Sequence, residues 1–555
     1  MDDKKEVITG ISASRGIARG PCKIVLNNQQ FQTIVEGDIL VTRMSSPDMI
    51  LVMKKCAGVI TDTGGMFSHA AIVSRELEIP CVVGTGNATC LLINNQLVEV
   101  NGDKGQISYR NENLDSIDPC LASSPRDKAR IVTMKMNRNK PVHDENWNYS
   151  WPPINMEEEY EWLLYMPELI HDPIGSLSLS SIEKVPYVFG FDDIGPLYAR
   201  FHNCIYHIRL DKIDKLIQRI RAKINPDFVK AYKEKLSSSQ EAFDKITEAL
   251  EKNSPFTETT IPKLLELFKL WWEKFDQFLS IRFLIQIIGE DIISPQIKDI
   301  LSSKLEDTQT AKHLSILLLP TAETYSSEFL RDFTELIRNA KKEKSIIFSK
   351  VDEKEVINIL KVTQSGRIWL QRLELFVKKW GWVRTRILYY EPISKTEQVL
   401  KFLKMFDTEK MFIPSFEENN RQFQKTLTEL RGILPEEKVN SLIFYVNFAK
   451  FLLQEKDDHY YIFLKNSNII RELLLELGKK LKMRKILSDE RDIFFVFVWE
   501  MFDLCSKEIP IDDKLKITTR IENRMTAFTF TSGIVLHKHT GYNPGQKPAK
   551  DSEYY

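Results

Sequence analysis

The chain has 555 residues, which is too long for one hydrophobic core, so we expect three or four domains or subdomains. Hydrophobic residues make up 43% of the sequence and charged residues 28%, as is typical of a soluble globular protein. The 77 basic and 77 acidic residues cancel to a formal net charge of zero, which provides no bulk attraction to nucleic acid or to an anionic membrane. We therefore expect neither of these as a partner.

Cysteine usage and the N-terminus bear on where the protein works. Seven cysteines are scattered along the chain, and their odd number argues against a disulfide framework. Residues 1–6 do not form a signal segment, and no apolar stretch approaches the length of a membrane span. These features predict a cytoplasmic protein.

Residues 57–84 carry the most informative pattern. Ala57–Thr61 and Ile79–Val83 are short apolar runs of strand type, and Ser68–Glu78 between them has apolar residues at helical spacing. The segment therefore predicts a strand, a turn, a helix and a second strand, in that order.

A histidine stands at the start of this predicted helix, behind two glycines. Gly64 and Gly65 lack the Cβ atoms that would keep a ligand from the backbone, and Ser68 is a good residue to begin a helix. His69 then falls in the first turn, where the helix dipole stabilises an anion by up to about 1 to 2 kcal/mol. Neutral imidazole is a competent nucleophile, so the pattern predicts a covalent phosphate carrier.

A denser pattern covers the same segment, and it consists of Thr61, Gly64, Gly65, Ser68, His69, Ala70, Ala71, Arg75, Glu76, Leu77, Ile79 and Pro80. It resembles the phosphohistidine swivelling domain of the PEP-utilising enzymes, which include PEP synthase, pyruvate phosphate dikinase, rifampicin phosphotransferase and phenylphosphate synthase. Residues 10–20, 37–42 and 101–105 resemble the start, a strand and the closing turn of that domain. The resemblance implies one complete β/β/α swivelling domain over residues 1–112.

The same resemblance implies roles for individual residues. His69 would be catalytic, taking a phosphoryl group at one active site and releasing it at another. The phosphate-binding or supporting residues would be Thr61, Gly64, Gly65, Ser68 and Arg75. Two alternatives stay open, because His69 could instead be a structural histidine at a helix start and Arg75 a solvated surface charge. No cluster with metal-ligand spacing surrounds His69, so no metal site is expected.

The chain changes character after the first domain. Residues 113–153 are polar and rich in proline, which predicts a linker of the kind that a moving domain needs. Residues 154–415 mostly have the period of amphipathic helices and predict a helical domain, where an acceptor could bind. Residues 416–540 predict a second helical subdomain ending in a β-hairpin, and residues 541–555 a disordered tail. The expected fold class is multidomain α+β.

The predicted helices of this region include 261–288, 327–340, 362–379, 436–455 and 469–482. Near the end of the chain, Glu490–Phe495 and Phe528–Leu536 resemble pieces that precede the swivelling domain in the family. That domain stands at the N-terminus here, so the resemblance implies a permuted order. The element at Trp382 lacks the histidine of a family Tyr-Gly-His-Arg element, so no catalytic role is transferred to it.

Several parts of a self-sufficient enzyme have no counterpart in the sequence. We find no P-loop, no stretch that resembles an ATP-grasp domain, and no β/α alternation long enough for a PEP-binding barrel. Phenylphosphate synthase-like systems imply that ATP, with most of the Mg²⁺ ligands, is bound by a separate ATP-grasp-type nucleotide-binding subunit.

These observations lead to three hypotheses. The first is a phosphotransferase component in which His69 takes a phosphoryl group from ATP on the partner subunit and passes it to a small-molecule acceptor. The second is a non-enzymatic scaffold or regulatory protein that retains the domain for docking. The third is a carrier that takes its phosphoryl group from PEP, bound on a separate barrel subunit.

Overall fold

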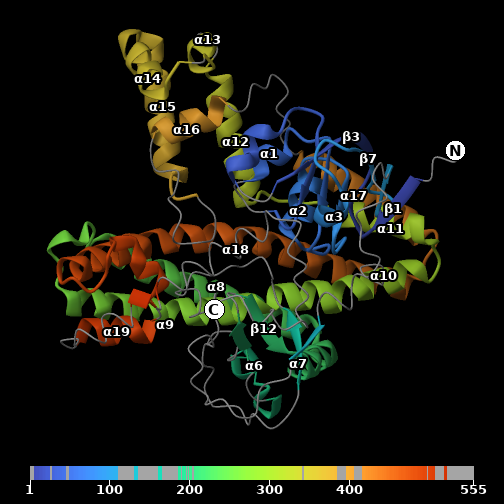
Figure 1. Ribbon diagram of the computed structural model, residues 1–555. Coiled ribbons are helices and arrows are strands. Elements are labelled where there is room, and N and C mark those ends of the chain that lie inside the picture. The colour runs from blue at the N-terminus through green and yellow to red at the C-terminus, as the bar shows by residue number, and fades with distance from the viewer. Residues whose placement is uncertain are drawn as a thin grey trace, which may run out of the picture. The chain divides into compact units, whose positions relative to one another are not determined.

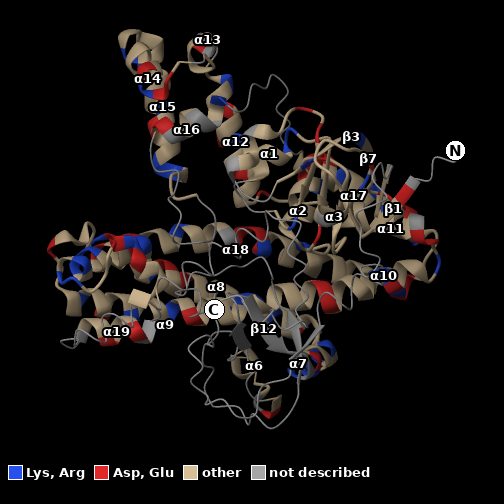
Figure 2. Cartoon of the chain, in the orientation of Figure 1, with Lys and Arg blue, Asp and Glu red and all other residues tan. Residues whose placement is uncertain are grey.

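The computed structural model describes most of the chain, and its elements are labelled in Figure 1. The described residues are 5–25, 28–45, 49–110, 131–134, 160–164, 185–188, 190–194, 197, 199–202, 205–340, 343–349, 351–383, 396–404, 415–496, 498–506, 518–519 and 521. An N-terminal mixed sheet is followed by a largely helical region. Figure 2 shows basic and acidic residues interspersed along the helices, in keeping with the net charge of zero.

The chain divides into two compact units, and neither unit is one continuous segment. The first unit contains residues 1–121, 289–386 and 390–465. The second contains residues 122–288, 387–389 and 466–555. Each domain predicted from the sequence is one continuous segment, whereas each of these two units combines several segments. The two divisions differ in kind, and the predicted domain limits stay predictions.

An eight-stranded mixed sheet forms the N-terminal part of the first unit, in the order β1-β8-β7-β3-β4-β5-β6-β2. Its strands are β1 (Lys5–Thr9), β2 (Ile11–Ser14), β3 (Ile17–Ile24), β4 (Ile39–Thr42), β5 (Gly58–Thr61), β6 (Cys81–Val83), β7 (Leu97–Asn101) and β8 (Gln106–Arg110). Neighbours from β3 to β6 are parallel, and the other pairs are antiparallel. Parallel pairs need crossover connections, and helices α1 (Ile50–Met53) and α2 (His69–Glu76) lie in two of them.

Both faces of this sheet are buried. Leu40 and Val59 belong to the core on one face, whereas Ile39 and Ile60 belong to the core on the other. Successive side chains of a strand point to opposite faces, so a strand covered on both sides must be apolar throughout. This explains why β4 and β5 read as continuous apolar runs in the sequence.

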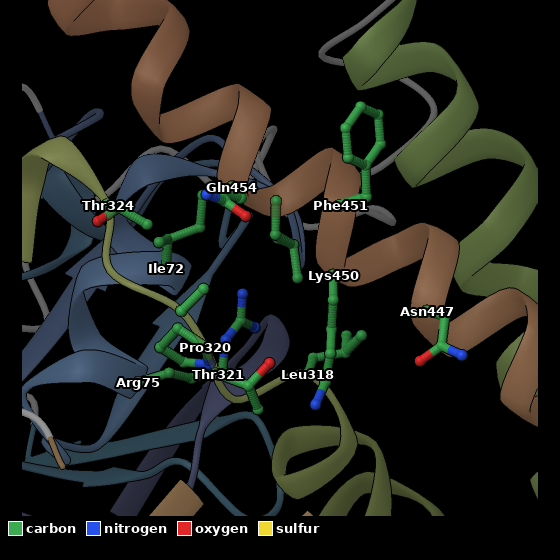
Figure 3. Close-up of a pocket in the computed structure, with 12 residues that line it drawn as sticks. Ile72, Arg75, Leu318, Pro320, Thr321, Thr324, Asn447, Lys450, Phe451 and Gln454 are labelled. Carbon is green, nitrogen blue, oxygen red and sulfur yellow. The ribbon is translucent and has the colours of Figure 1, made fainter. Parts of the chain in front are cut away.

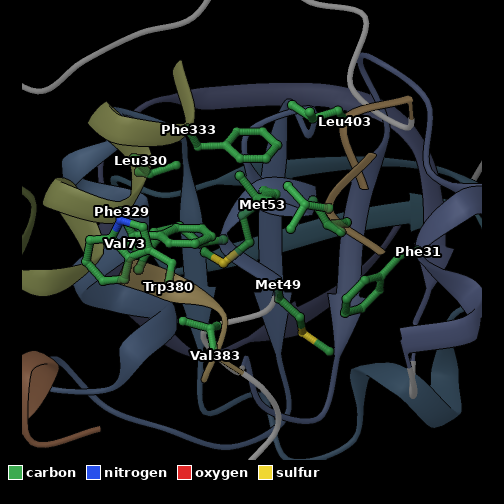
Figure 4. Close-up of a cluster of buried hydrophobic side chains, with 14 of the residues drawn as sticks. Phe31, Met49, Met53, Val73, Phe329, Leu330, Phe333, Trp380, Val383 and Leu403 are labelled. Atoms are coloured by element: carbon green, nitrogen blue, oxygen red, sulfur yellow. The ribbon is translucent and has the colours of Figure 1, made fainter. Parts of the chain in front are cut away.

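Helices from much later in the chain complete the core on the α2 side. Phe329 and Phe333 of helix α12 (Tyr325–Arg338) cluster with Met53 of α1, Val73 of α2 and Trp380, as Figure 4 shows. Burying a phenylalanine side chain contributes about 1.5 to 3 kcal/mol. The packing therefore holds α2, and with it the position of His69, against the helical part of the same unit.

Other elements surround this core. They are η1 (Asn28–Thr33), α3 (Ala88–Leu91), α10 (Ser294–Ser302), α11 (Asp307–Leu317), α13 (Lys344–Ile347), α14 (Glu353–Val362), α15 (Gln364–Trp380), α16 (Thr396–Lys404) and α17 (Phe416–Arg431). A seven-residue π-helix, η7 (Ile287–Ile293), follows helix α9 and contributes its last five residues to the first unit.

Helix α18 (Glu436–Met483) is continuous where the sequence predicts two helices with a break after residue 455. Residues 456–468, which the prediction left out of both helices, include charged and polar residues. Asp457 among them is buried, with its carboxylate accepting hydrogen bonds from the backbone N–H (3.1 Å) and hydroxyl (2.6 Å) of Ser326 at the start of α12. Asp457 thus binds the start of α12 from within α18, although the sequence prediction ends a helix just before it.

The second unit contains a long helix pair and a small sheet. Its helices are α6 (Val185–Val188), η5 (Asp192–Ile194), α7 (Leu210–Lys223), α8 (Pro226–Glu251), η6 (Phe256–Glu258), α9 (Ile261–Gln286), η8 (Glu490–Phe495), α19 (Val498–Ser506) and the end of α18. Its antiparallel strands are β9 (Ile131–Met134), β10 (Tyr160–Leu164), β11 (Ala199–His202) and β12 (Ile205–Arg209). No local signal predicted these strands, whose pairing partners include residues far away in the sequence.

Some predictions lie outside the described residues. These are the C-terminal hairpin at 528–536, the tail at 541–555, and all of the linker 113–153 except β9. Within the described part of the chain, no helix combines the length and apolar character that crossing a lipid bilayer requires.

Candidate functional site

The loop between β5 and α2 presents the histidine that the sequence singled out. Helix α2 begins at His69, and Ser68 is its N-cap, with Oγ accepting a hydrogen bond from Ala71 N at 3.3 Å. An N-cap of this kind contributes about 1 kcal/mol to helix stability. His69 is therefore held at the positive end of the α2 dipole, where an anion is stabilised.

The turn ahead of Ser68 depends on Gly64. Its φ is +111°, a conformation that side-chain-bearing residues rarely adopt. A Cβ at this position would also lie 2.8 Å from Ser68 Cβ, which is closer than real contacts allow. Gly64 thus brings the turn against the N-cap, in agreement with a supporting role.

A serine that the sequence analysis missed contacts His69. Ser45 Oγ lies 2.8 Å from Nδ1 of the imidazole, and Ser45 is buried. Ser45 follows β4, and the parallel neighbour β5 leads into the His69 loop, so both residues come from the carboxyl ends of adjacent strands. Ligand sites in α/β sheets gather at that edge, and the rule could have identified Ser45.

Thr61 and Asp62 shape the loop from inside. The Thr61 hydroxyl donates to the Thr63 carbonyl at 2.7 Å, and the Thr61 carbonyl accepts from Thr85 N at 3.1 Å. The buried Asp62 carboxylate accepts from Thr89 N at 2.9 Å, and burial raises its pKa. Thr61 therefore supports the turn, with its hydroxyl committed to a backbone carbonyl.

Arg75 lies inside the molecule, only 2% exposed, so the alternative of a solvated surface charge is wrong. Its Nη1 donates to the Ala13 carbonyl at 3.2 Å and its Nη2 to the Met66 carbonyl at 2.7 Å. Burial lowers its pKa to about 10, which still leaves it charged at neutral pH. The guanidinium thus ties α2 to strand β2 and to the loop that precedes His69.

A second missed residue, Glu290 of the π-helix η7, contacts the same loop. Its Oε1 accepts a hydrogen bond from Phe67 N at 2.9 Å, and its carboxylate lies so close to Gly65 that a Cβ there would be 2.1 Å from Oε2. Beside it, Gly289 leaves room for the fully buried Phe67 ring, which a Cβ would approach to 2.7 Å. Single-turn π-helices often occur at functional sites.

The other end of α2 is also fastened. Glu76 is buried, and its Oε1 accepts a hydrogen bond from the Thr324 hydroxyl at 3.3 Å. Burial first, and then the negative charge of Asp457, raise the pKa of Glu76 well above its ordinary value. Glu76 thus fastens the C-terminal end of α2 to the start of α12.

The structure brings Thr61, Gly64, Gly65, Ser68 and His69 together in one loop and places Arg75 beneath it. His69 Nε2 is buried in this arrangement, so a substrate could not reach it unless the loop or its neighbours moved. In the described part of the chain, no group of three or more His, Cys, Asp or Glu side chains could hold a metal ion. We assign no Mg²⁺ ligands to these residues.

Comparisons with known proteins concern this same segment. Residues 34–105 match the family model described as "PEP-utilising enzyme, mobile domain". The chain is 52% identical over 107 residues to a probable phosphoenolpyruvate synthase of Methanothermobacter thermautotrophicus, covering 19% of this chain and 16% of that protein. It is 45% identical over 107 residues to the phosphoenolpyruvate synthase of Pyrococcus furiosus, covering 19% of this chain and 13% of that one.

A third relative is an uncharacterized phosphotransferase of Bacillus subtilis, YvkC, which is 41% identical over 111 residues, or 20% of this chain and 13% of that protein. The matches span less than a fifth of the length of these relatives. The segment 34–105 that matches the family model contains strands β4 to β7 and the loop that carries His69. Residues 34–105 of this chain therefore match the PEP-utilising enzyme mobile domain.

Proposed function

We propose that this chain is a phosphotransferase component that carries a phosphoryl group on His69. The group comes from ATP bound with Mg²⁺ on a separate ATP-grasp-type subunit and goes to a small-molecule acceptor. One observation carries the proposal: His69 is the first residue of an N-capped helix inside a segment that matches the PEP-utilising mobile domain.

The contact of Ser45 with His69 supports a nucleophilic role. If Nδ1–H donates to Ser45 Oγ, the free lone pair of the imidazole lies on Nε2. Nε2 then forms a bond to phosphorus while the bond from phosphorus to the leaving oxygen of the nucleotide breaks, and that oxygen keeps the electron pair. The positive end of α2 stabilises the negative charge that arrives with the phosphoryl group.

Burial of Nε2 supports a swivelling domain rather than a fixed site. The donor must approach Nε2 in line with the bond that breaks, and Nε2 is buried in the arrangement described. We infer that the arrangement described is a docked state, and that residues 1–112 undock to reach the donor.

The names of the relatives support a phosphotransferase enzyme and leave two donors to compare. The first hypothesis uses ATP, whereas the name phosphoenolpyruvate synthase makes PEP the alternative donor. We propose the cytoplasm as the compartment, which suits the free thiols of Cys22, Cys56 and Cys81. The proposal includes no nucleic-acid or membrane partner.

Intact-mass spectrometry tests the proposal. The full chain, mixed with the ATP-grasp-type partner and Mg-ATP, should gain the mass of one phosphoryl group, and acid should remove it. His69→Ala should remain unmodified, whereas His313→Ala, a control histidine on α11, should be modified like the wild type.

The donor and the alternatives are separated by parallel reactions. Modification by PEP with a separate barrel protein, and not by ATP, would favour the third hypothesis. Equal spectra for the wild type and His69→Ala would refute the carrier role. Partner binding that survives His69→Ala, without modification by either donor, would favour a scaffold.

A further inference from the structure

A cavity of about 260 Å³ lies in the first unit beside α2 (Figure 3). One wall is α2, which contributes Ile72 and Arg75, and a second wall is the segment 318–324. The third wall is α18, which contributes Lys450 and Gln454 among others. Since a water molecule occupies about 30 Å³ in the liquid, the volume fits a small metabolite rather than a single water or ion.

Lys450 lines this cavity and has no acidic partner in the part of the chain that the structure describes. Its ammonium lies over the Phe423 ring, whose centroid is 3.6 Å from Nζ. Burial alone lowers its pKa to about 8, so no carboxylate offsets the cost of burying the ammonium. Such a cost is offset when an anion binds.

Arg75 supplies a second positive group from the opposite wall. Its Nη1 and Nη2 donate to backbone carbonyls, but the buried Nε has no acceptor among the described residues. A guanidinium presents its donors in one plane, so a free Nε–H next to a cavity offers a directed hydrogen bond. Thr321, Asn447 and Gln454 add neutral polar groups to the lining.

Acidic groups near the cavity do not cancel these charges. Glu290 and Glu76 interact electrostatically with Arg75. Burial raises the pKa of Glu76 and of Asp457, and each carboxyl group accepts a hydrogen bond from a residue at the start of α12, Glu76 from Thr324 and Asp457 from Ser326. Glu290 is committed to Phe67 N in the His69 loop. The cavity therefore keeps a positive potential.

We propose that this cavity binds a small oxyanion, a carboxylate or a phosphate, between Lys450 and Arg75. The site goes beyond the phosphoryl carrier function, because His69 does not line the cavity and its ligand is not the group that His69 carries. Its walls come from the mobile domain on one side and from α18 on the other, so the ligand would bind only while α2 is docked. By mass action, the ligand would then stabilise the docked state.

Isothermal titration calorimetry of the full chain tests the site, with inorganic phosphate and acetate as separate probes. We expect one of these anions to bind with a stoichiometry of one, and the stronger binder identifies the chemistry. Lys450→Gln should weaken binding by about ten-fold or more, since it removes a charge-assisted hydrogen bond. Lys450→Arg should retain most of the affinity, and Lys465→Gln, an exposed lysine on the same helix, should bind like the wild type.

The pH dependence gives a second readout. With a Lys450 pKa of about 8, affinity for an anion should fall as the pH rises from neutral through about 9, and Lys450→Gln should lose this dependence. His69→Ala should bind the anion normally, so failure of the carrier function would not affect this test. The proposal is overturned if the wild type binds neither anion, or if Lys450→Gln binds as tightly as the wild type.

Discussion

Contact between Glu290 and the His69 loop yields a double-mutant prediction. Gly65→Ala places a Cβ 2.1 Å from Glu290 Oε2, so the carboxylate must move and its hydrogen bond to Phe67 N must break or lengthen. Glu290→Ala removes the same hydrogen bond directly. The two substitutions should therefore not be additive, because each destroys the one interaction they share.

The magnitude follows from the geometry. A hydrogen bond from a backbone N–H to a charged acceptor contributes about 1.5 to 3 kcal/mol, and each single variant should lose most of it. In the Glu290→Ala background no carboxylate obstructs residue 65, and Gly65 does not have a positive φ. Alanine there should then be neutral or stabilising by about 0.4 to 1 kcal/mol.

Hydrogen exchange measured by mass spectrometry reports this local equilibrium. Opening free energies for peptides that cover residues 62–76 should fall by about 2 kcal/mol in each single variant, which is about 30-fold in exchange rate. Peptides of the β7–β8 hairpin serve as the internal control and should not change. Additive effects, or wild-type protection in Glu290→Ala, would show that Glu290 does not hold the loop.

Two further predictions concern Ser45 and Glu76. Ser45→Ala should slow formation of the phosphoryl adduct by about ten-fold, which is the equivalent of losing one hydrogen bond to the imidazole. Ser45→Thr keeps the hydroxyl and should retain most of the rate. An unchanged rate in Ser45→Ala would contradict the role of Nδ1. Since the folded-state pKa of Glu76 is raised, its contribution to stability is complete below the unfolded pKa of about 4.3 and is lost as the pH rises through the folded value. The free energy of unfolding, measured by denaturation at about pH 5 and pH 9, should therefore fall less for Glu76→Gln than for the wild type as the pH rises. Equal decreases in the two proteins would disprove the raised pKa of Glu76.

The sequence predicted the His69 loop well because its information is local. The strands, the glycine turn, the N-cap and the helix occupy one contiguous segment, and each obeys a short-range rule of backbone conformation. The rest of the N-terminal domain was expected from the family resemblance, since its sheet pairs strands as far apart as β1 and β8. Ser45 was also within reach, since it follows a predicted strand next to the one that leads to His69.

Long-range contacts explain what the sequence did not predict. Glu290 is 223 residues away from Phe67, and it lies in a helical stretch rich in isoleucine, where Gly289, Glu290 and Asp291 interrupt the apolar pattern. The sequence around these three residues does not show which part of the molecule they contact. The continuity of α18 is a similar case, because Asp457, in the segment left out of the two predicted helices, is hydrogen-bonded to Ser326 at the start of α12.

The contacts of α2 bear on how a phosphoryl group would move the domain. Glu290 holds the loop at the start of the helix, and Thr324 contacts Glu76 at its end. A phosphoryl group on His69 would add negative charge to the loop that Glu290 contacts. Two like charges about 5 Å apart repel by about 3 kcal/mol at an effective dielectric constant of 20. This is comparable to the hydrogen bond that Glu290 makes with Phe67 N, so we expect phosphorylation to weaken the contact between Glu290 and the loop, and release of the phosphoryl group to restore it.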